Sequence, residues 1–217
     1  MDRDNVRPNY RVVVLGSAGV GKSSIISKFM HDRFLESHKE TIEELHRHVM
    51  WFDSVSVEID ILDTSGSYQF PAMRKLAIAT GDAFVLVYSV DNTSSFETVK
   101  ILRDEIREQK PKGKYSIVVV ANKVDLETFK DTSCAVTESV VCMDWEERFV
   151  IVSAKTGENV NEVFQALENK IRERITLEEK RLNFIRRRTM PVMRMAKSEK
   201  FSVGLLKSKS RTHSMDS

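Results

Sequence analysis

Apolar residues in this 217-residue chain fall into short runs separated by longer stretches with helical spacing. Such runs, bounded by polar residues or glycine, are typical of strands buried inside a sheet. They predict six strands, near residues 10–15, 45–52, 55–62, 83–89, 115–121 and 149–153. The second and third strands are joined by the tight connection Phe52-Asp53-Ser54, so this pair should be antiparallel.

The stretches between the strands carry the pattern of amphipathic helices. Ser94 with Glu97, and Asn159 with Glu162, match the capping box that begins many helices. Each precedes an apolar stripe that we interpret as core: Val99, Leu102 and Ile106, and then Val160, Val163, Phe164, Leu167 and Ile171. The alternation predicts an α/β fold with a doubly wound, mostly parallel six-stranded sheet, one antiparallel strand and flanking helices.

Residues 16–23 match the phosphate-binding pattern G-x-x-x-x-G-K-[ST]. Glycines let the backbone curl so that its N–H groups point at phosphate oxygens. Lys22 can then reach the terminal phosphates, and the Ser23 hydroxyl can bind Mg²⁺. The strand before and the helix after argue against an idle glycine-rich turn and predict a P-loop NTPase. The expected nucleotide contacts are Gly16, Ser17, Ala18, Gly19, Val20, Gly21, Lys22, Ser23 and Ser24.

Two polar segments after later strands are suited to recognising the base. Asn122-Lys123-Val124-Asp125 follows an apolar run, at the end of a strand where open α/β sheets place ligand contacts. A carboxylate there can accept two hydrogen bonds from guanine, whereas adenine offers no such pair of donors. Ser153-Ala154-Lys155 ends the last strand and can meet the guanine oxygen through its backbone. We therefore expect GTP or GDP, bound also by Asn122, Lys123, Asp125, Ser153, Ala154 and Lys155.

Two further segments offer groups for a metal ion and the terminal phosphate. Asp63-Thr64-Ser65-Gly66 closes a strand, so that Asp63 can hold Mg²⁺ through water and the Gly66 N–H can meet the terminal phosphate. Thr41 lies in a polar stretch without clear period, which Mg²⁺ and the γ-phosphate could order and hydrolysis release. Mg²⁺ is the expected cofactor, with Ser23, Thr41 and Asp63 as its candidate ligands.

The chain resembles a Ras-family small GTPase in five segments taken in order: GSAGVGKS, TIE (41–43), DTSG (63–66), NKVD (122–125) and SAK (153–155). The resemblance covers residues 9 to 176. Residues 62–66, 70–74 and 80–82 are similar to the Rhes/Dexras and Di-Ras branches of the family.

The resemblance implies roles that the residues alone do not. Phe34 should pack against the guanine, Thr41 and Ser23 should ligate Mg²⁺, and loops near 35–44 and 64–76 should be the two switches. Effector proteins are expected to bind around Thr41-Ile42-Glu43. An exchange factor and a GTPase activator are the other expected partners.

The chain departs from the family beside the terminal phosphate. Ser67 stands where a glutamine usually orients the attacking water, and serine is too short to reach the same point. Ala18 stands where Ras itself has glycine, and its methyl group would crowd an incoming arginine finger. We assign catalytic roles to Thr41, Gly66 and Ser67, and we expect a signal-transduction switch that hydrolyses GTP slowly.

Two other functions use the same phosphate site. The alternative is a non-cycling, GTP-bound interaction protein, which would share every binding residue. A P-loop kinase or ATPase is disfavoured by Asn122 and Asp125, and the short chain leaves no obvious domain for a second substrate.

Charge is divided along the chain. The net charge is +2, yet residues 170–217 hold 14 Lys and Arg against 5 Asp and Glu. We expect an extension at residues 1–8, a small GTPase domain at 9–176 and a basic, flexible tail at 177–217. Such a tail either attracts an anionic membrane or is merely solvated. Its few aromatic residues give no reason to expect nucleic acid.

Cysteine usage bounds the cellular setting. The chain has only Cys134 and Cys142, no signal-like start and no apolar run near 18 residues, which predicts a reducing, intracellular location. The tail ends Ser214-Met215-Asp216-Ser217 and contains no cysteine, so prenylation is not expected. We expect a monomer in the cytoplasm, peripheral on the inner face of the plasma membrane.

Overall fold

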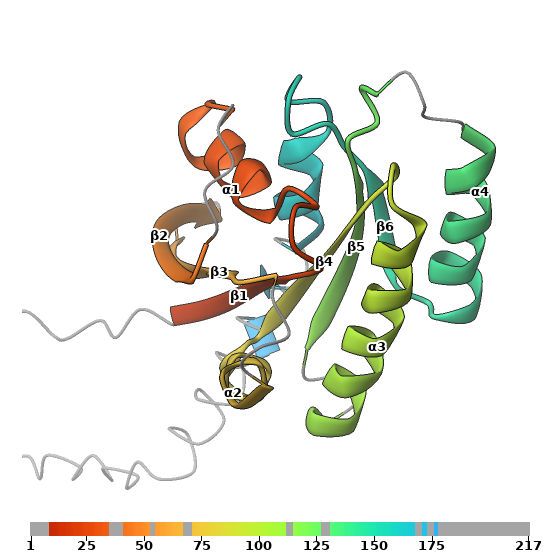
Figure 1. The fold of residues 1–217 in the computed structure, drawn as a ribbon. Helices are drawn as coiled ribbons and strands as arrows, with labels where there is room; N and C mark the ends of the chain where they lie inside the picture. The colour runs from red at the N-terminus through yellow and green to blue at the C-terminus, as the bar shows by residue number, and fades with distance from the viewer. Residues whose placement is uncertain are drawn as a thin grey trace, which may run out of the picture. The chain divides into compact units, whose positions relative to one another are not determined.

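One six-stranded sheet, in the order β2-β3-β1-β4-β5-β6, organises the fold (Figure 1). The computed structural model describes residues 9–34, 41–52, 55–66, 71–111, 115–126, 131–167, 171–172 and 176–177. The chain divides into two units, residues 1–179 and 180–217, and every described residue lies in the first. The predicted extension at 1–8 and all but the first residue of the predicted tail lie outside the described residues. Those domain boundaries stay predictions.

The strands lie where the apolar runs predict them. They are β1 (Asn9–Leu15), β2 (Glu43–Phe52), β3 (Val55–Thr64), β4 (Ala83–Ser89), β5 (Ser116–Asn122) and β6 (Arg148–Ile151). β2 pairs with β3 in antiparallel register, and every other neighbouring pair is parallel. The predicted mostly parallel, doubly wound sheet is confirmed.

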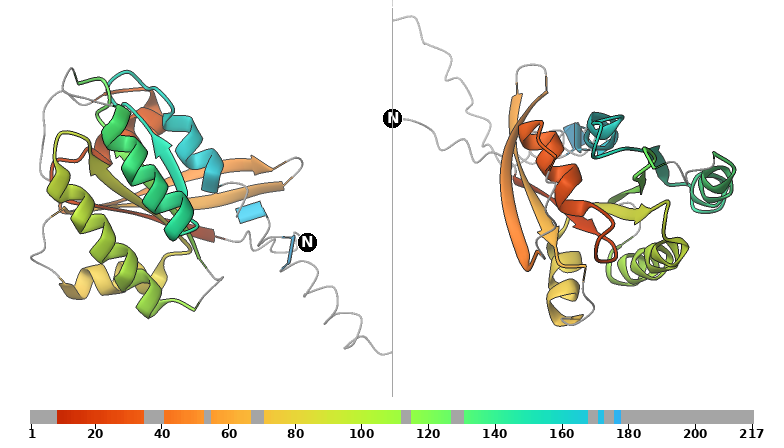
Figure 2. Two further views of the ribbon diagram at one scale, coloured as in Figure 1. Left: turned by 90° about the vertical axis from the view of Figure 1, so that its right-hand side faces the viewer. Right: turned by 45° about the horizontal axis from the view of Figure 1, so that its top comes forward.

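Helices cover both faces of the sheet (Figure 2). They are α1 (Lys22–His31), α2 (Pro71–Thr80), α3 (Thr93–Gln109) and α4 (Asp131–Ser139), which continues into the π-helical turn η1 (Val140–Asp144); residues 160–167 are also helical. Side chains of α1 and of residues 160–167 pack on one face, and those of α2, α3, α4 and η1 pack on the other. Among the described helices, none combines the length and apolar character needed to cross a membrane.

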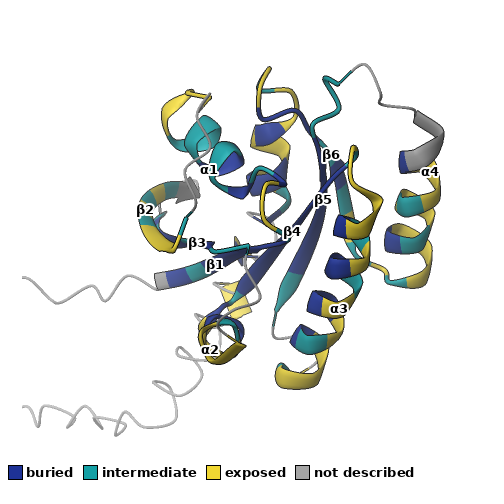
Figure 3. Cartoon of the chain, viewed as in Figure 1, coloured by how far each residue is buried: buried dark blue, intermediate teal, exposed yellow. Residues whose placement is uncertain are grey.

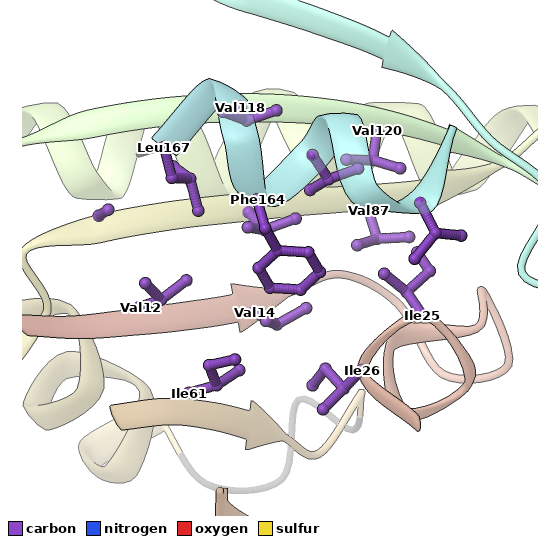
Figure 4. Close-up of a cluster of buried hydrophobic side chains, with 14 of the residues drawn as sticks. Val12, Val14, Ile25, Ile26, Ile61, Val87, Val118, Val120, Phe164 and Leu167 are labelled. Carbon is purple, nitrogen blue, oxygen red and sulfur yellow. The ribbon is translucent and has the colours of Figure 1, made fainter. Parts of the chain in front are cut away.

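The central strands are buried on both sides because alternate side chains point to opposite faces. All seven residues of β4 are buried. On one face, the strands pack against Ile25 and Ile26 of α1 and against Phe164, which Figure 4 shows among the valines of β1, β4 and β5. The other face packs against the predicted stripe of α3, Val99, Leu102 and Ile106. Figure 3 shows the result, with buried strands inside and exposed outer helix faces.

The predicted capping boxes are not formed. Asn92 is the N-cap of α3 and makes no capping bond with its side chain, because its Oδ1 accepts a hydrogen bond from the Ser94 hydroxyl at 2.7 Å. Asn159 has a φ of 55° and its amide donates to the Ile151 carbonyl at 3.0 Å. Both helices form where predicted, but Ser94 bonds to its neighbour Asn92 and Asn159 bonds to Ile151, so neither side chain takes the capping role that the local pattern assigned to it.

Candidate nucleotide-binding site

The loop between β1 and α1 has the curled backbone that the glycine pattern predicts. Gly19 and Gly21 have φ values of 73° and 99°, in the left-handed region that favours glycine. A side chain at Gly21 would also collide with the amide of Asn122, at the end of β5. The P-loop therefore lies directly against the loop that should read the base.

Lys22 is folded over this loop. Its side chain is buried, and its ammonium donates to the carbonyl oxygens of Gly16, at 3.0 Å, and Ser17, at 2.9 Å. Burial lowers the pKa of Lys22 to about 8, and the charge of Asp63 opposes that shift. A desolvated ammonium beside a nest of backbone N–H groups is well suited to hold phosphate oxygens.

Three oxygen-bearing side chains meet beside Lys22. The Ser23 hydroxyl lies 2.8 Å from the Thr41 hydroxyl and donates to the Asp63 carboxylate at 2.5 Å. Asp63 is almost fully buried, and burial raises its pKa against the opposing Ser23 hydrogen bond and Lys22 charge. Ser23, Thr41 and Asp63 come from three separate elements, and the structure brings together all three predicted metal ligands.

These residues fit Mg²⁺. The second carboxylate oxygen of Asp63, Oδ1, is buried and has no hydrogen-bond partner among the described residues. An unpaired buried carboxylate oxygen is costly, and a cation would satisfy it. Mg²⁺ prefers oxygen ligands and is usually bound by one or two carboxylates together with substrate phosphates. Within the described part of the chain, no group of three or more His, Cys, Asp or Glu could hold a metal instead.

Gly66 lies against the P-loop. A Cβ added to Gly66 would collide with the backbone of Ala18 and the carbonyl carbon of Ser17. The Thr64 hydroxyl donates to the Val14 carbonyl at 2.7 Å and so ties the end of β3 to β1. Only glycine permits this approach, which brings Gly66 beside the place where the P-loop should hold phosphate. Ser67, the third predicted catalytic residue, lies outside the described residues.

Asn122 ties three loops together. It is 1% exposed, its amide nitrogen donates to the Val20 carbonyl at 2.8 Å, and its amide oxygen accepts from the Ala154 N–H at 3.1 Å. The P-loop, the segment 122–125 and the segment 153–155 therefore share one buried side chain.

Asp125 is oriented by the neighbouring loop. Its carboxylate accepts a hydrogen bond from the Ser153 hydroxyl at 2.6 Å, and Ser153 in turn accepts from the Thr156 N–H at 3.1 Å. Ser153 is fully buried, so these contacts hold Asp125 in one orientation. Lys155 is exposed, and so is Phe34, the last described residue before a gap, while Ser24 lies half-buried on α1. Among the described residues, no hydrogen bond or ion pair ties the side chains of Phe34, Lys155 and Ser24 to the rest of the site.

The structure also shows supporting residues that the sequence motifs did not single out. Asp91, just after β4, forms an ion pair with Lys123 at 3.3 Å, and the Ser89 hydroxyl holds the other carboxylate oxygen of Asp91 at 2.5 Å. The Ser17 hydroxyl donates to Thr98 of α3 at 2.9 Å. Both pairs join residues far apart in the chain, so local patterns carry no signal for them.

Comparison with known proteins agrees with this fold and site. The model of the Ras family matches residues 11–173, and the chain belongs to that family. It is similar to the GTP-binding protein Rhes of Mus musculus, Rattus norvegicus and Homo sapiens, with 42% identity over 168 residues in each case. That match covers 73% of this chain and 63% of each relative, so the chain spans less than two thirds of the length of these curated relatives. The predicted resemblance to the Ras family and to Rhes is confirmed.

The role of Asn122 leads to a prediction. Asn122→Ala leaves the Val20 carbonyl and the Ala154 N–H without their partner, at about 1–3 kcal/mol for each buried group left unpaired. The two groups together cost about 2–6 kcal/mol, so we expect the dissociation constant for GDP to rise by at least about thirtyfold. Fluorescence titration with labelled GDP measures it.

The matched control is Asn159→Ala, which removes an exposed asparagine that also donates to a backbone carbonyl. Its GDP affinity should stay near that of the unsubstituted protein. Equal losses in the two variants would contradict a specific role for Asn122.

Proposed function

We propose that this protein is a guanine-nucleotide-binding switch that binds GTP and GDP with Mg²⁺ and hydrolyses GTP slowly. The observation that carries the proposal is the meeting of Ser23, Thr41 and Asp63 beside the P-loop, with hydroxyl and carboxylate oxygens 2.8 and 2.5 Å apart. The similarity to Rhes, which is named a GTP-binding protein, supports the same assignment.

Each group of residues is proposed to bind a different part of the nucleotide. The P-loop N–H groups and Lys22 hold phosphate oxygens, and Asp125 accepts hydrogen bonds from guanine. Ser23, Thr41 and Asp63 hold Mg²⁺, which when bound neutralises charge on the β- and γ-phosphates. Asn122 keeps the phosphate and base loops at a set spacing through its two backbone hydrogen bonds.

Switching depends on two segments that meet the terminal phosphate. Thr41 precedes β2, and Gly66 follows β3, so both segments continue directly into the antiparallel pair of the sheet. GTP has the γ-phosphate that the Gly66 N–H can meet, and GDP lacks it. Loss of that phosphate therefore removes contacts from both segments, which is a known route to a two-state surface.

Slow hydrolysis is expected from two departures in the sequence, Ser67 and Ala18. Ser67 is too short to hold a water molecule where glutamine does in related proteins. Ala18 is exposed in the P-loop, and its backbone packs against Gly66. A methyl group here narrows the space for an arginine finger, a group that contributes roughly 10³–10⁵ in rate where it operates.

The nucleotide bound to the purified protein tests the assignment. We expect predominantly GTP when the protein is denatured and the released nucleotide is separated by chromatography. Mostly GDP would mean that hydrolysis proceeds without the glutamine. Adenine nucleotide, or none, would overturn the guanine assignment.

A single substitution tests the account of hydrolysis. Ser67→Gln should raise the single-turnover rate of GTP hydrolysis by about tenfold or more, equivalent to at least about 1.4 kcal/mol of barrier. The reason is that glutamine restores a group long enough to orient water. Ser139→Gln, an exposed serine at the end of α4, is the matched control and should change nothing.

The same assay separates the switch from the non-cycling alternative. A non-cycling GTP-bound protein should retain its nucleotide when Mg²⁺ is chelated and should show no hydrolysis in either variant. A switch should release nucleotide on chelation, because Ser23, Thr41 and Asp63 lose the ion that links them to the phosphates.

Protein partners are proposed at the surface beside Thr41. Ile42 is 81% exposed, and with Met73 of α2 it lines a hollow that opens to solvent. These exposed apolar residues lie on two segments that should change conformation with the γ-phosphate. They could therefore form a binding surface for an effector protein. An exchange factor and a GTPase activator are proposed on family grounds, and we propose that the protein is a monomer that binds no nucleic acid.

We further propose that the basic tail attracts the protein from the cytoplasm to the inner face of the plasma membrane. The tail residues lie outside the described structure, so charge alone supports this proposal. Replacing Arg186, Arg187 and Arg188 with alanine should weaken binding to phosphatidylserine vesicles by about a hundredfold, at about 1 kcal/mol per charge. Vesicle sedimentation measures it.

Phosphatidylcholine vesicles serve as the control and should not bind either protein. High salt should abolish binding to the anionic vesicles, because screening weakens surface charge. Unchanged binding by the triple variant would contradict the membrane proposal.

A further inference from the structure

A hydrogen bond joins the P-loop to a helix that supplies no predicted nucleotide ligand. The Ser17 hydroxyl donates to the Thr98 hydroxyl of α3 at 2.9 Å, across 81 residues of sequence. The Thr98 hydroxyl donates onward to the Ser94 carbonyl at 3.4 Å, and the Thr98 side chain is buried. The P-loop is therefore fastened to the first turns of α3 by a short chain of hydroxyl groups.

The backbone of Ser17 lies between the two groups that should meet the terminal phosphate. Its carbonyl oxygen accepts the Lys22 ammonium at 2.9 Å. Its carbonyl carbon and the backbone of Ala18 are the atoms against which Gly66 lies. A shift of the Ser17–Ala18 peptide would therefore move the support of Gly66 and the hydrogen-bond partner of Lys22 together.

A second attachment joins helix α3 to α2. Arg74 of α2 forms a two-point ion pair with Glu105 of α3, Nε to Oε2 at 2.8 Å and Nη2 to Oε1 at 3.0 Å. The two side chains are only 22% and 27% exposed, and planar two-point pairs of this kind hold geometry well. Glu105 lies seven residues, about two helical turns, after Thr98, so both attachments leave one face of α3.

These attachments surround one hollow. Thr98, Gly66 and Arg74 all line the hollow described above. Thr98 of α3 and Arg74 of α2 therefore border the same hollow as Gly66. Helix α3 therefore contacts both the P-loop and α2.

We infer that Ser17 and Thr98 are a positioning pair that sets the preference of the site for GTP over GDP. This inference rests on the proposed function. The P-loop meets phosphates that both nucleotides share, whereas Gly66 can meet only the γ-phosphate. Loosening the peptide that supports Gly66 therefore weakens GTP binding more than GDP binding.

A purely structural hydrogen bond would behave differently. Its loss would lower stability and weaken both nucleotides by the same factor. The ratio of the two affinities is therefore the quantity that distinguishes a positioning role from a structural one.

The test uses the full chain and three single variants. Ser17→Ala and Thr98→Val remove a hydroxyl, and Thr98→Val keeps the side-chain shape, while Thr98→Ser retains the hydroxyl as the matched control. Dissociation constants for GDP and for the imido analogue of GTP are measured with Mg²⁺ present, alongside melting temperatures. Two hydroxyl deletions at different sites protect the test against the failure of either variant to fold.

We expect Ser17→Ala and Thr98→Val each to lower the preference for the GTP analogue by about threefold to tenfold, the range typical of one net hydrogen bond. Thr98→Ser should keep the original preference. The double variant Ser17→Ala/Thr98→Val should lose no more than Thr98→Val alone, because that variant already removes the Ser17–Thr98 bond together with the bond from Thr98 to the Ser94 carbonyl.

Two results would overturn the inference. An unchanged preference in the hydroxyl deletions, with guanine nucleotide still bound by the unsubstituted protein, would overturn it and leave the proposed function standing. Failure of the unsubstituted protein to bind either nucleotide would overturn the proposed function and this inference with it.

Discussion

Burial of the central strands on both faces is the constraint on which the rest of this structure depends. Every residue of β4 is buried, and β5 is buried at all but its first residue. A ligand-binding group within such a strand would have to be desolvated without a partner, which is costly. The polar side chains of the site therefore lie where the strands end, as Asp63 does in β3 and Asn122 in β5. Because the strands are parallel, these ends gather at one edge of the sheet.

Burial opposes the charges of two residues at that edge. Desolvation pushes the pKa of Lys22 down and the pKa of Asp63 up, so each group is driven toward its neutral form. The ammonium is left to backbone carbonyls, and one carboxylate oxygen has no described partner. Native structures tolerate few such groups, and those that persist concentrate at functional sites. A phosphate chain with its cation would satisfy both residues at once, which is why the arrangement favours a nucleotide site.

Several residues hold the loops of the site in position. Asn122 spans the base and phosphate loops, and Thr98 and Glu105 attach α3 to the P-loop and to α2. Asn122 and Thr98 are uncharged and buried, and Glu105 is only partly exposed. They matter because a loop whose conformation depends on one phosphate needs neighbouring elements that keep their positions. A two-state surface requires a rigid frame as well as mobile segments.

The sequence by itself determined the sheet and the order of its motifs, because apolar runs and glycine spacing are local patterns with direct physical meaning. It also identified Ser23, Thr41 and Asp63 as a set, through the order of their segments, and the structure brings them within hydrogen-bond distance. Local reasoning failed where a side chain had a choice of partners. Asn159 matched a capping box, yet its amide donates to Ile151, which only the packed fold brings near.

Only the tertiary structure decided which polar residues support the site. Asp91 reaches Lys123 because β4 and β5 are neighbours in the sheet, and Ser17 reaches Thr98 because α3 packs beside the P-loop. Asn122 and Ser153 are residue types that are common in turns. In the folded protein both are buried, and their side chains hydrogen-bond to neighbouring loops. Periodicity and motifs predict which residues are buried in the core and which lie at the ends of strands. The pairing of groups far apart in the chain depends on strand order and helix packing, which no short stretch of sequence contains.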